Sequence, residues 1–198
     1  MATDLHAITN SKPLSSFSEQ ELAKVLKKLK ALNWERFKYP RIVDDKEIWV
    51  EALGEWEAER DEEAEYPDIY YSSPYPISFY LKENLGIVTF IYKYRFLYDI
   101  SNDDEEILAF RKDLFDFISV FGATEVCFLA DNACNKMSNL LELQAFENCS
   151  YDKIKTDLLK EFGKPVTDYR KLEYDTLNYR NITEFIFDDF KDFKSNLK

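Results

Sequence analysis

The sequence predicts a single α+β domain, in which several amphipathic helices cover an antiparallel sheet. The strongest indication is a β-hairpin over residues 77–98, where two segments dense in β-branched and aromatic residues flank a short loop. Segments with apolar residues at helical spacing lie on both sides of this hairpin. Helical and extended segments do not alternate regularly, which favours α+β over a doubly wound fold. We therefore expect the hairpin to seed the sheet of one domain that spans residues 1–198.

The first predicted elements are a flexible lead-in over residues 1–16 and a helix over residues 18–32. The lead-in is polar and lacks a clear hydrophobic period. The helix is marked by Ser18 and Glu21, which have the spacing of a capping box, and by the apolar stripe that follows them.

A second helix is predicted over residues 45–63, because its large apolar residues fall on one side of a helical wheel. These residues are Ile48, Trp49, Ala52, Leu53 and Trp56. The next segment, residues 67–76, contains three prolines and is predicted to be a turn-rich linker that leads into the hairpin.

Within the hairpin, the strands are predicted over residues 77–82 and 87–98. Tyr92, Tyr94 and Phe96 alternate along the second strand and therefore share one face, which we expect to be buried. Replacing a buried Phe by Ala typically costs ~3–5 kcal/mol. The pattern therefore predicts that Phe96→Ala strongly destabilises the domain.

Two further helices and two further strands complete the predicted domain. The helices cover residues 103–121 and 150–162, each with a capping residue at its start and a glycine after its end. The strands cover residues 125–130 and 182–187 and are expected to join the hairpin sheet. Residues 137–147 fit both periods, so the sequence leaves their conformation open.

The charge of the chain disfavours several classes of partner. The chain carries 38 acidic and 26 basic side chains, a net charge of −12. Nucleic acids and anionic membranes attract basic surfaces, so we expect neither as a partner. An acidic surface instead suits a soluble protein, or one that binds a basic protein.

Cysteine usage and hydropathy indicate a cytoplasmic protein. Three cysteines are an odd number in a chain of this size, which fits a reducing compartment better than a disulfide framework. No segment approaches the ~18–20 apolar residues of a membrane span. The first residues also lack the charged and apolar regions of a secretory signal.

The sequence offers no recognisable catalytic, metal-binding or cofactor-binding motif. Its four glycines form no phosphate-binding loop, and its single histidine, His6, lies in the predicted lead-in rather than in the predicted core. The spacing of the cysteines matches no zinc motif. We therefore expect no metal and no cofactor, and an enzyme is the less favoured class.

More than half of the net charge lies in residues 55–68, which hold eight acidic side chains and one arginine. Such a charge run is either a solvated helix end or loop, or a binding patch for a basic partner. The residues that would form this patch are Glu55, Glu57, Glu59, Asp61, Glu62, Glu63, Glu65 and Asp68.

Two classes of function fit these observations. The first is a protein-binding module, most concretely an acidic immunity-type inhibitor that neutralises a basic toxin by covering its active site. The alternative is a small enzyme or ligand-binding protein that uses carboxylates and tyrosines near Asp131, which follows a predicted strand. An exposed acidic ridge would favour the first class, and an aromatic-lined pocket the second.

Overall fold

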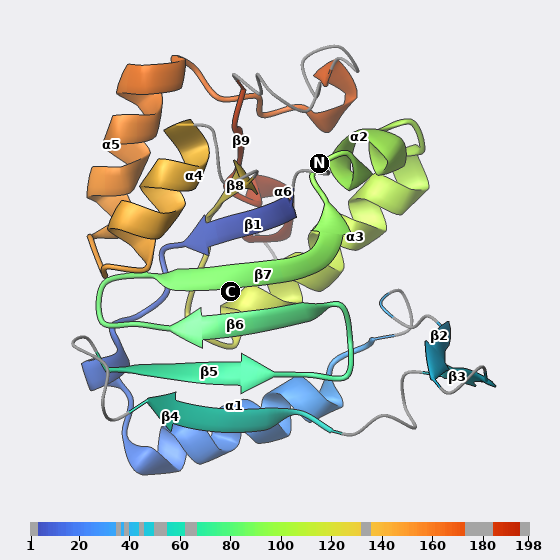
Figure 1. The fold of residues 1–198 in the computed structure, drawn as a ribbon, viewed down its shortest axis with the longest axis vertical. Helices are drawn as coiled ribbons and strands as arrows, with labels where there is room; N and C mark the ends of the chain where they lie inside the picture. The colour runs from blue at the N-terminus through green and yellow to red at the C-terminus, as the bar shows by residue number, and fades with distance from the viewer. Residues whose placement is uncertain are drawn as a thin grey trace.

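The computed structural model describes residues 4–34, 37, 40–43, 46–49, 55–61, 67–131, 136–172 and 184–194. Its centre is a seven-stranded sheet in which all neighbouring strands are antiparallel, which confirms the α+β class (Figure 1). In spatial order the strands are β4 (Glu57–Asp61), β5 (Asp68–Ser72), β6 (Ile77–Leu81), β7 (Gly86–Lys93), β1 (Asp4–Thr9), β8 (Val126–Asp131) and β9 (Ile186–Asp188). A separate two-stranded sheet consists of β2 (Pro40–Val43) and β3 (Lys46–Trp49).

Helices flank this sheet. They are α1 (Glu19–Ala31), α2 (Phe96–Ser101), α3 (Asp104–Ser119), α4 (Lys136–Leu140), α5 (Tyr151–Phe162) and α6 (Lys191–Lys194). Shorter helical segments are η1 (Leu14–Ser16), η4 (Leu141–Ala145) and η5 (Tyr169–Lys171). Within the described residues, no helix combines the length and the hydropathy that a bilayer crossing requires.

The two faces of the sheet are covered differently. Helices α1 and α3 lie behind the sheet in Figure 1, where Phe79 of β6 stacks on Phe121 with ring centroids 3.8 Å apart. On the opposite face, α4 and α5 lie over β1 and β8, and Cys127 Sγ is 3.5 Å from the hydroxyl of Tyr151. Among the described elements, no helix is drawn in front of β4, β5 and β6 (Figure 1). Within the described part of the chain, one half of this face therefore has no helix over it.

Local sequence signals set the ends of the main helices, as predicted. The Glu21 N–H donates to Ser18 Oγ over 3.3 Å, and the Ser18 N–H donates to the Glu21 carboxylate over 2.8 Å, which completes the capping box of α1. The side chains of Asp103 and Ser150 accept backbone N–H groups at the starts of α3 and α5. Gly163 follows α5 with a φ of 78°, which glycine adopts without strain.

The predicted hairpin is confirmed as β6 and β7, but its second strand is shorter than predicted and Phe96 begins α2. The helix prevails over β-propensity because Leu97 and Ile100 lie one turn apart and are both buried. Tyr92, Tyr94 and Phe96 therefore do not share one strand face. Tyr94 is buried, whereas Tyr92 and Phe96 are half-buried and stack with ring centroids 4.3 Å apart. Phe96→Ala should accordingly destabilise less than truncation of a fully buried Phe.

The lead-in prediction is wrong for residues 4–9, which form β1 in the interior of the sheet. β1 pairs with β7 on one side and with β8 on the other, and its Leu5, Ala7 and Ile8 are fully buried. A strand of 6 residues is too short to show a clear hydrophobic period. Its conformation is fixed by backbone hydrogen bonds to strands that lie far along the chain.

The helix predicted over residues 45–63 is also wrong, because β3 and β4 occupy most of its described part. Its remaining residues, apart from Glu55 and Trp56, lie outside the described part of the chain. In β4, Glu57 and Glu59 alternate with residues that face α1, a period of two that is typical of a strand. Trp56 was predicted to be a packing residue, and its 4% exposure confirms this.

The predicted linker at residues 67–76 contains a strand, β5, that pairs on both of its edges. Pro67 stands before this strand, and Pro74 and Pro76 stand between it and β6. At these positions a proline removes no hydrogen bond from the sheet. The prolines therefore separate strands instead of marking a structureless linker.

The remaining elements agree with the predictions within small shifts of their boundaries. The helices predicted over residues 103–121 and 150–162 are α3 and α5, and the strand predicted over residues 125–130 is β8. The strand predicted over residues 182–187 is confirmed at residues 186 and 187, which begin β9, while residues 182 and 183 lie outside the described part of the chain. Residues 137–147, which the sequence left open, are helical over most of their length as α4 and η4.

Candidate functional site

Strand β4 forms one edge of the sheet and carries two exposed acidic residues of the predicted patch, Glu57 and Glu59. Glu55, just before the strand, pairs with Lys30 of α1, and the hydrogen bond from Lys30 lowers the pKa of the Glu55 carboxyl. Asp61 is the last residue of the strand. The patch residues Glu62, Glu63 and Glu65 lie outside the described part of the chain.

Asp68 was predicted to belong to the acidic patch, but the structure buries it. Its Oδ2 lies 2.7 Å from Nζ of Lys82, and only 13% of the Asp68 side chain and 5% of the Lys82 side chain are exposed. The reason is that Asp68 begins β5, which directs its carboxylate toward the end of β6 instead of toward solvent. A buried carboxylate requires such a partner, so Asp68 stabilises the fold and is not available to a partner protein.

Tyrosines lie beside the acidic residues of β4. The strand register places Glu59 opposite Tyr70 and Tyr70 opposite Tyr80, and the two tyrosine rings are 4.5 Å apart. Phe146 contacts Tyr80 edge-on at 5.7 Å. Partial burial raises the pKa of Tyr80, with smaller contributions from Tyr70 and Asp68, so its hydroxyl stays protonated. We call this surface the open face; it consists of Glu57, Glu59, Tyr70, Ser72 and Tyr80.

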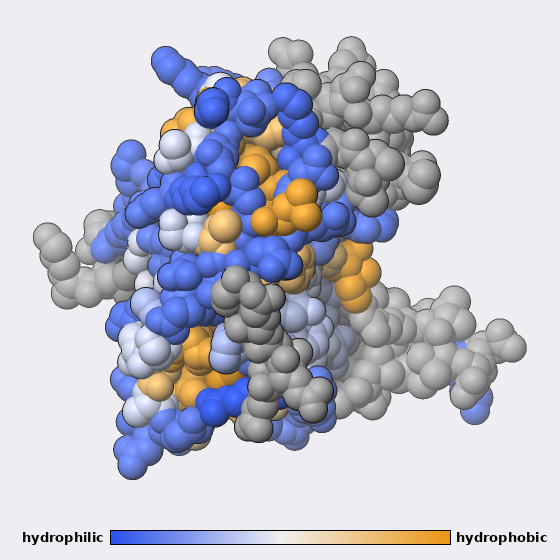
Figure 2. All heavy atoms as spheres, turned by 60° about the vertical axis from the view of Figure 1, so that its left-hand side comes forward, coloured by the Kyte–Doolittle hydropathy of each residue, from blue (hydrophilic) through white to orange (hydrophobic). Residues whose placement is uncertain are grey.

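Farther along the same side of the sheet, hydroxyl and apolar groups replace the charges. Ser78 and Thr89 form a hydrogen bond between β6 and β7, and Ile91 of β7 is 56% exposed. Figure 2, which turns the left-hand side of Figure 1 forward, shows a largely hydrophilic surface with apolar atoms in separate patches. This side of the sheet therefore presents carboxylates and tyrosine rings toward β4 and hydroxyl and apolar groups toward β7.

The structure places His6 in β1, next to the carboxylate of Asp131 at the end of β8. His6 Nε2 is 3.6 Å from Asp131 Oδ2, and the two side chains are 17% and 22% exposed. Burial lowers the pKa of His6, although Asp131 and Asp4 act in the opposite direction. Sequence reasoning assigned no histidine to the core, because it took β1 for a flexible lead-in. The alternation of Leu5 and Ala7 around His6 was the only available signal.

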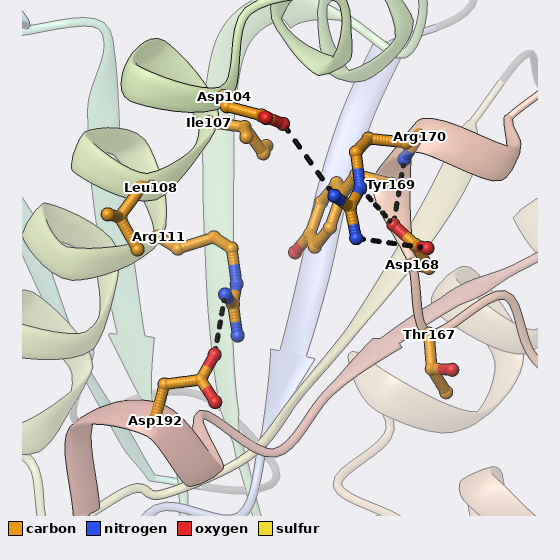
Figure 3. Close-up of a pocket in the computed structure, with 9 residues that line it drawn as sticks. All are labelled: Asp104, Ile107, Leu108, Arg111, Thr167, Asp168, Tyr169, Arg170 and Asp192. Carbon is orange, nitrogen blue, oxygen red and sulfur yellow. Dashed lines mark hydrogen bonds and ion pairs between the residues drawn. The ribbon is translucent and has the colours of Figure 1, made fainter.

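A pocket of about 410 Å³ lies between α3, α6 and the segment around η5 (Figure 3). Arg111 reaches toward it from α3, and Arg170 approaches it from the opposite side. Arg170 Nε donates to Asp168 over 2.9 Å and its Nη1 lies 3.8 Å from Asp104, with 62% of the side chain exposed. The charges that border the pocket therefore pair largely with one another.

Asp188 of β9, the partner of the pocket residue Arg111, is saturated with hydrogen bonds. It accepts from Arg111 Nε over 2.6 Å and from Arg111 Nη2 over 3.0 Å. It also accepts from the Tyr169 hydroxyl over 3.2 Å and from the Phe190 N–H over 2.8 Å. The bonds to Asp188 raise the pKa of Arg111, and burial raises that of Tyr169, so all donors keep their protons. A carboxylate has about four acceptor sites, so Asp188 has none left for a substrate.

Cys127 is not an activated nucleophile. Cys127 is fully buried, and this burial raises the pKa of its thiol to about 11, which leaves it protonated at neutral pH. Cys149 is half-buried, and Cys134 lies outside the described part of the chain. Among the described residues, no three His, Cys, Asp or Glu side chains are grouped in a way that could hold a metal ion.

Comparison of the chain with protein-family models, with curated proteins and with solved structures found no match. Among the described residues, the open face and the edge strand beside it present exposed carboxylates next to tyrosine rings.

Proposed function

We propose that this protein is a binding module for a basic protein, most concretely an immunity-type inhibitor that neutralises a basic toxin by covering its active site. The observation that carries the proposal is the position of Glu57 and Glu59. Both are exposed on an edge strand, and the register places Glu59 beside Tyr70, whose ring lies 4.5 Å from that of Tyr80 on the next strand.

The chemistry of the open face suits lysine and arginine side chains. Exposed carboxylates attract cations from a distance and accelerate association, while tyrosine rings bind a cation over their faces at short range. Tyrosine also contributes large contact area with little loss of side-chain entropy. The net charge of −12 adds a long-range attraction for a basic partner.

The proposal is tested with two matched baits. Affinity capture from the native lysate is performed with the parent protein and with a Glu57→Gln and Glu59→Gln double variant. The control bait carries Glu105→Gln and Glu106→Gln. These two residues are exposed acids at the start of α3, so their substitution removes the same amount of charge at a site away from β4. A basic protein retained by the parent and the control, but depleted on the β4 variant, is the expected result.

The inhibitory role is then tested on the captured protein. Its enzymatic or toxic activity is measured alone, with the parent and with the β4 variant. We expect inhibition by the parent and weaker inhibition by the variant, most clearly at low salt. Equal capture by all three baits contradicts a role for β4, and an uninhibited partner contradicts the immunity-type role.

A second candidate function, a small enzyme or ligand-binding protein around Asp131, is favoured by the proximity of His6. A carboxylate beside a largely buried imidazole can orient the ring for proton transfer. The test is a panel of ester and phosphoester substrates assayed with the parent and with His6→Gln. Turnover by the parent that the variant loses would support this candidate, and its absence across the panel would count against it.

A further inference from the structure

The two edges of the seven-stranded sheet differ in how their backbone groups are satisfied. At β9, Val166 runs alongside the strand: its N–H donates to the Phe185 carbonyl over 3.0 Å, and the Phe187 N–H donates to the Val166 carbonyl over 3.0 Å. At β4, the described part of the chain contains no segment that pairs with the outer side of the strand. As far as the described residues show, the outer backbone groups of β4 have no strand partner and can hydrogen-bond an additional strand.

The two sides of this free edge offer different chemistry. On the open face, an added strand would meet the carboxylates of Glu57 and Glu59. On the other side, a groove of about 270 Å³ lies between α1, β4 and β5. Its apolar lining comes from Leu22, Ala23 and Leu26 of α1, with Ala58 and Ile69 from the two strands. Glu19 and Arg60, which form an ion pair at 3.0 Å, border this groove.

We infer that the outer edge of β4 binds an extended segment of the partner as an added strand, in which lysine or arginine alternates with apolar residues. Successive side chains of a strand point to opposite faces, so the basic ones meet Glu57 and Glu59 and the apolar ones meet the groove beside α1. This inference rests on the proposed function and names the mode of binding.

Charge excludes a second copy of this chain as the occupant. If two β4 strands paired with each other, the carboxylates of Glu57 and Glu59 would stand beside carboxylates of the other copy. Like charges directly opposite each other destabilise a strand pair. The acidic edge therefore rejects self-association and selects a basic strand, which is a known way for proteins to control exposed edges.

The experiment uses the full chain and the capped peptide Thr-Lys-Val-Lys-Val-Lys-Thr as the probe. Two further peptides have the same sequence: one is methylated on the backbone nitrogens of its lysines, the other on those of its valines. Each modification keeps the charge of the peptide and removes the N–H donors along one edge of the strand. We expect the unmethylated peptide to bind and to slow amide exchange in β4. One methylated peptide should lose binding at least tenfold, because only one edge of the added strand faces β4.

A pair of protein variants tests the groove separately. Ala23→Gln places a longer side chain in the groove and should weaken binding of the peptide several-fold. Ala31→Gln makes the same change at the exposed end of α1, outside the groove, and should leave binding unchanged.

The outcomes separate the inference from the proposed function. Equal binding of all three peptides, no slowing of amide exchange in β4, or no binding of the unmethylated peptide at millimolar concentration overturns the added strand. Loss of binding by one methylated peptide and not by the other, together with slowed exchange in β4, supports it. The proposed function is decided independently, by whether association of the captured partner depends on Glu57 and Glu59.

Discussion

The two ends of the sheet use their carboxylates in opposite ways. At the β9 end, Asp188 is 5% exposed and accepts four hydrogen bonds from inside the molecule. At the β4 end, Glu57 and Glu59 are exposed, and no cation among the described residues forms an ion pair with them. The comparison teaches that a net charge describes two populations of acids. Only those without an internal partner can attract another protein.

The largest expected effect is a loss of stability when Asp188, an acid with internal hydrogen-bond partners, is neutralised. Asp188→Asn leaves the Arg111 guanidinium, 18% exposed, without its buried counter-charge, which should lower the free energy of unfolding by ~3–5 kcal/mol. Urea denaturation measures this loss. Asp192→Asn is the matched control, because it removes an acid that contacts the same arginine but is 67% exposed. If both variants lose the same free energy of unfolding, the buried Asp188 contributes no more to stability than an exposed acid, and the distinction between the two ends of the sheet is wrong.

The next effect sharpens the comparison within the acidic segment itself. Asp68 lies only seven residues after Asp61, yet it pairs with Lys82 in the interior. Asp68→Asn should destabilise the protein by about 3 kcal/mol, because a single contact to Lys82 is lost. Chemical denaturation of this variant beside Glu59→Gln provides the check. Equal stability of the two variants would mean that Asp68 belongs with the exposed acids.

A smaller effect concerns the pH dependence that His6 contributes. Burial lowers the pKa of folded His6 below its ordinary value, so the unfolded chain takes up a proton first as the pH falls through about 6.5. The stability from the neutral imidazole is therefore present above this pH and is lost below it. Thermal unfolding from about pH 8 to about pH 5 should show a larger decrease for the parent than for His6→Gln. A larger decrease for the variant would mean that the attraction to Asp131 dominates.

The smallest expected effect on stability belongs to the exposed population. Glu57→Gln with Glu59→Gln should leave the unfolding midpoint unchanged, since exposed side chains without partners add little to folding. The same variant should associate more slowly with the captured partner at low salt. The difference should shrink as salt rises, because screening acts over ~8 Å at physiological ionic strength. Stopped-flow mixing at two salt concentrations measures the association rate and its dependence on salt. An association rate that the double variant leaves unchanged at low salt would refute the electrostatic attraction between Glu57, Glu59 and the partner.

Local signals in the sequence predicted the parts of the fold that are fixed locally. The Ser18 and Glu21 pair placed the start of α1, and Ser150 placed the start of α5. The hairpin of β6 and β7 joins neighbouring segments, so its β-branched and aromatic residues were sufficient to identify it. These elements need few partners from distant parts of the chain.

The missed elements depend on partners that a sequence pattern does not reveal. Strands β1, β4 and β5 are short, and the hydrogen bonds of their neighbours stabilise them more than their own composition does. The cluster of Arg111 with Asp188 joins residues 77 positions apart, and no spacing rule links them. Of the candidate site, the sequence identified Glu57 and Glu59 by charge density, but it could not separate them from the buried Asp68.

The interior position of β1 has a consequence for the synthesis of the chain. β1 leaves the ribosome before its neighbours β7 and β8, which end only at Lys93 and Asp131. At typical elongation rates this strand waits on the order of ten seconds for its second neighbour. The meander from β4 to β7 can form in the meantime, while the β8 and β9 half cannot dock. Pairing of β1 with β8 therefore comes after β1 and the meander can pair, and we expect a fusion or truncation that hinders β1 to leave β7 and β8 without the strand that joins them.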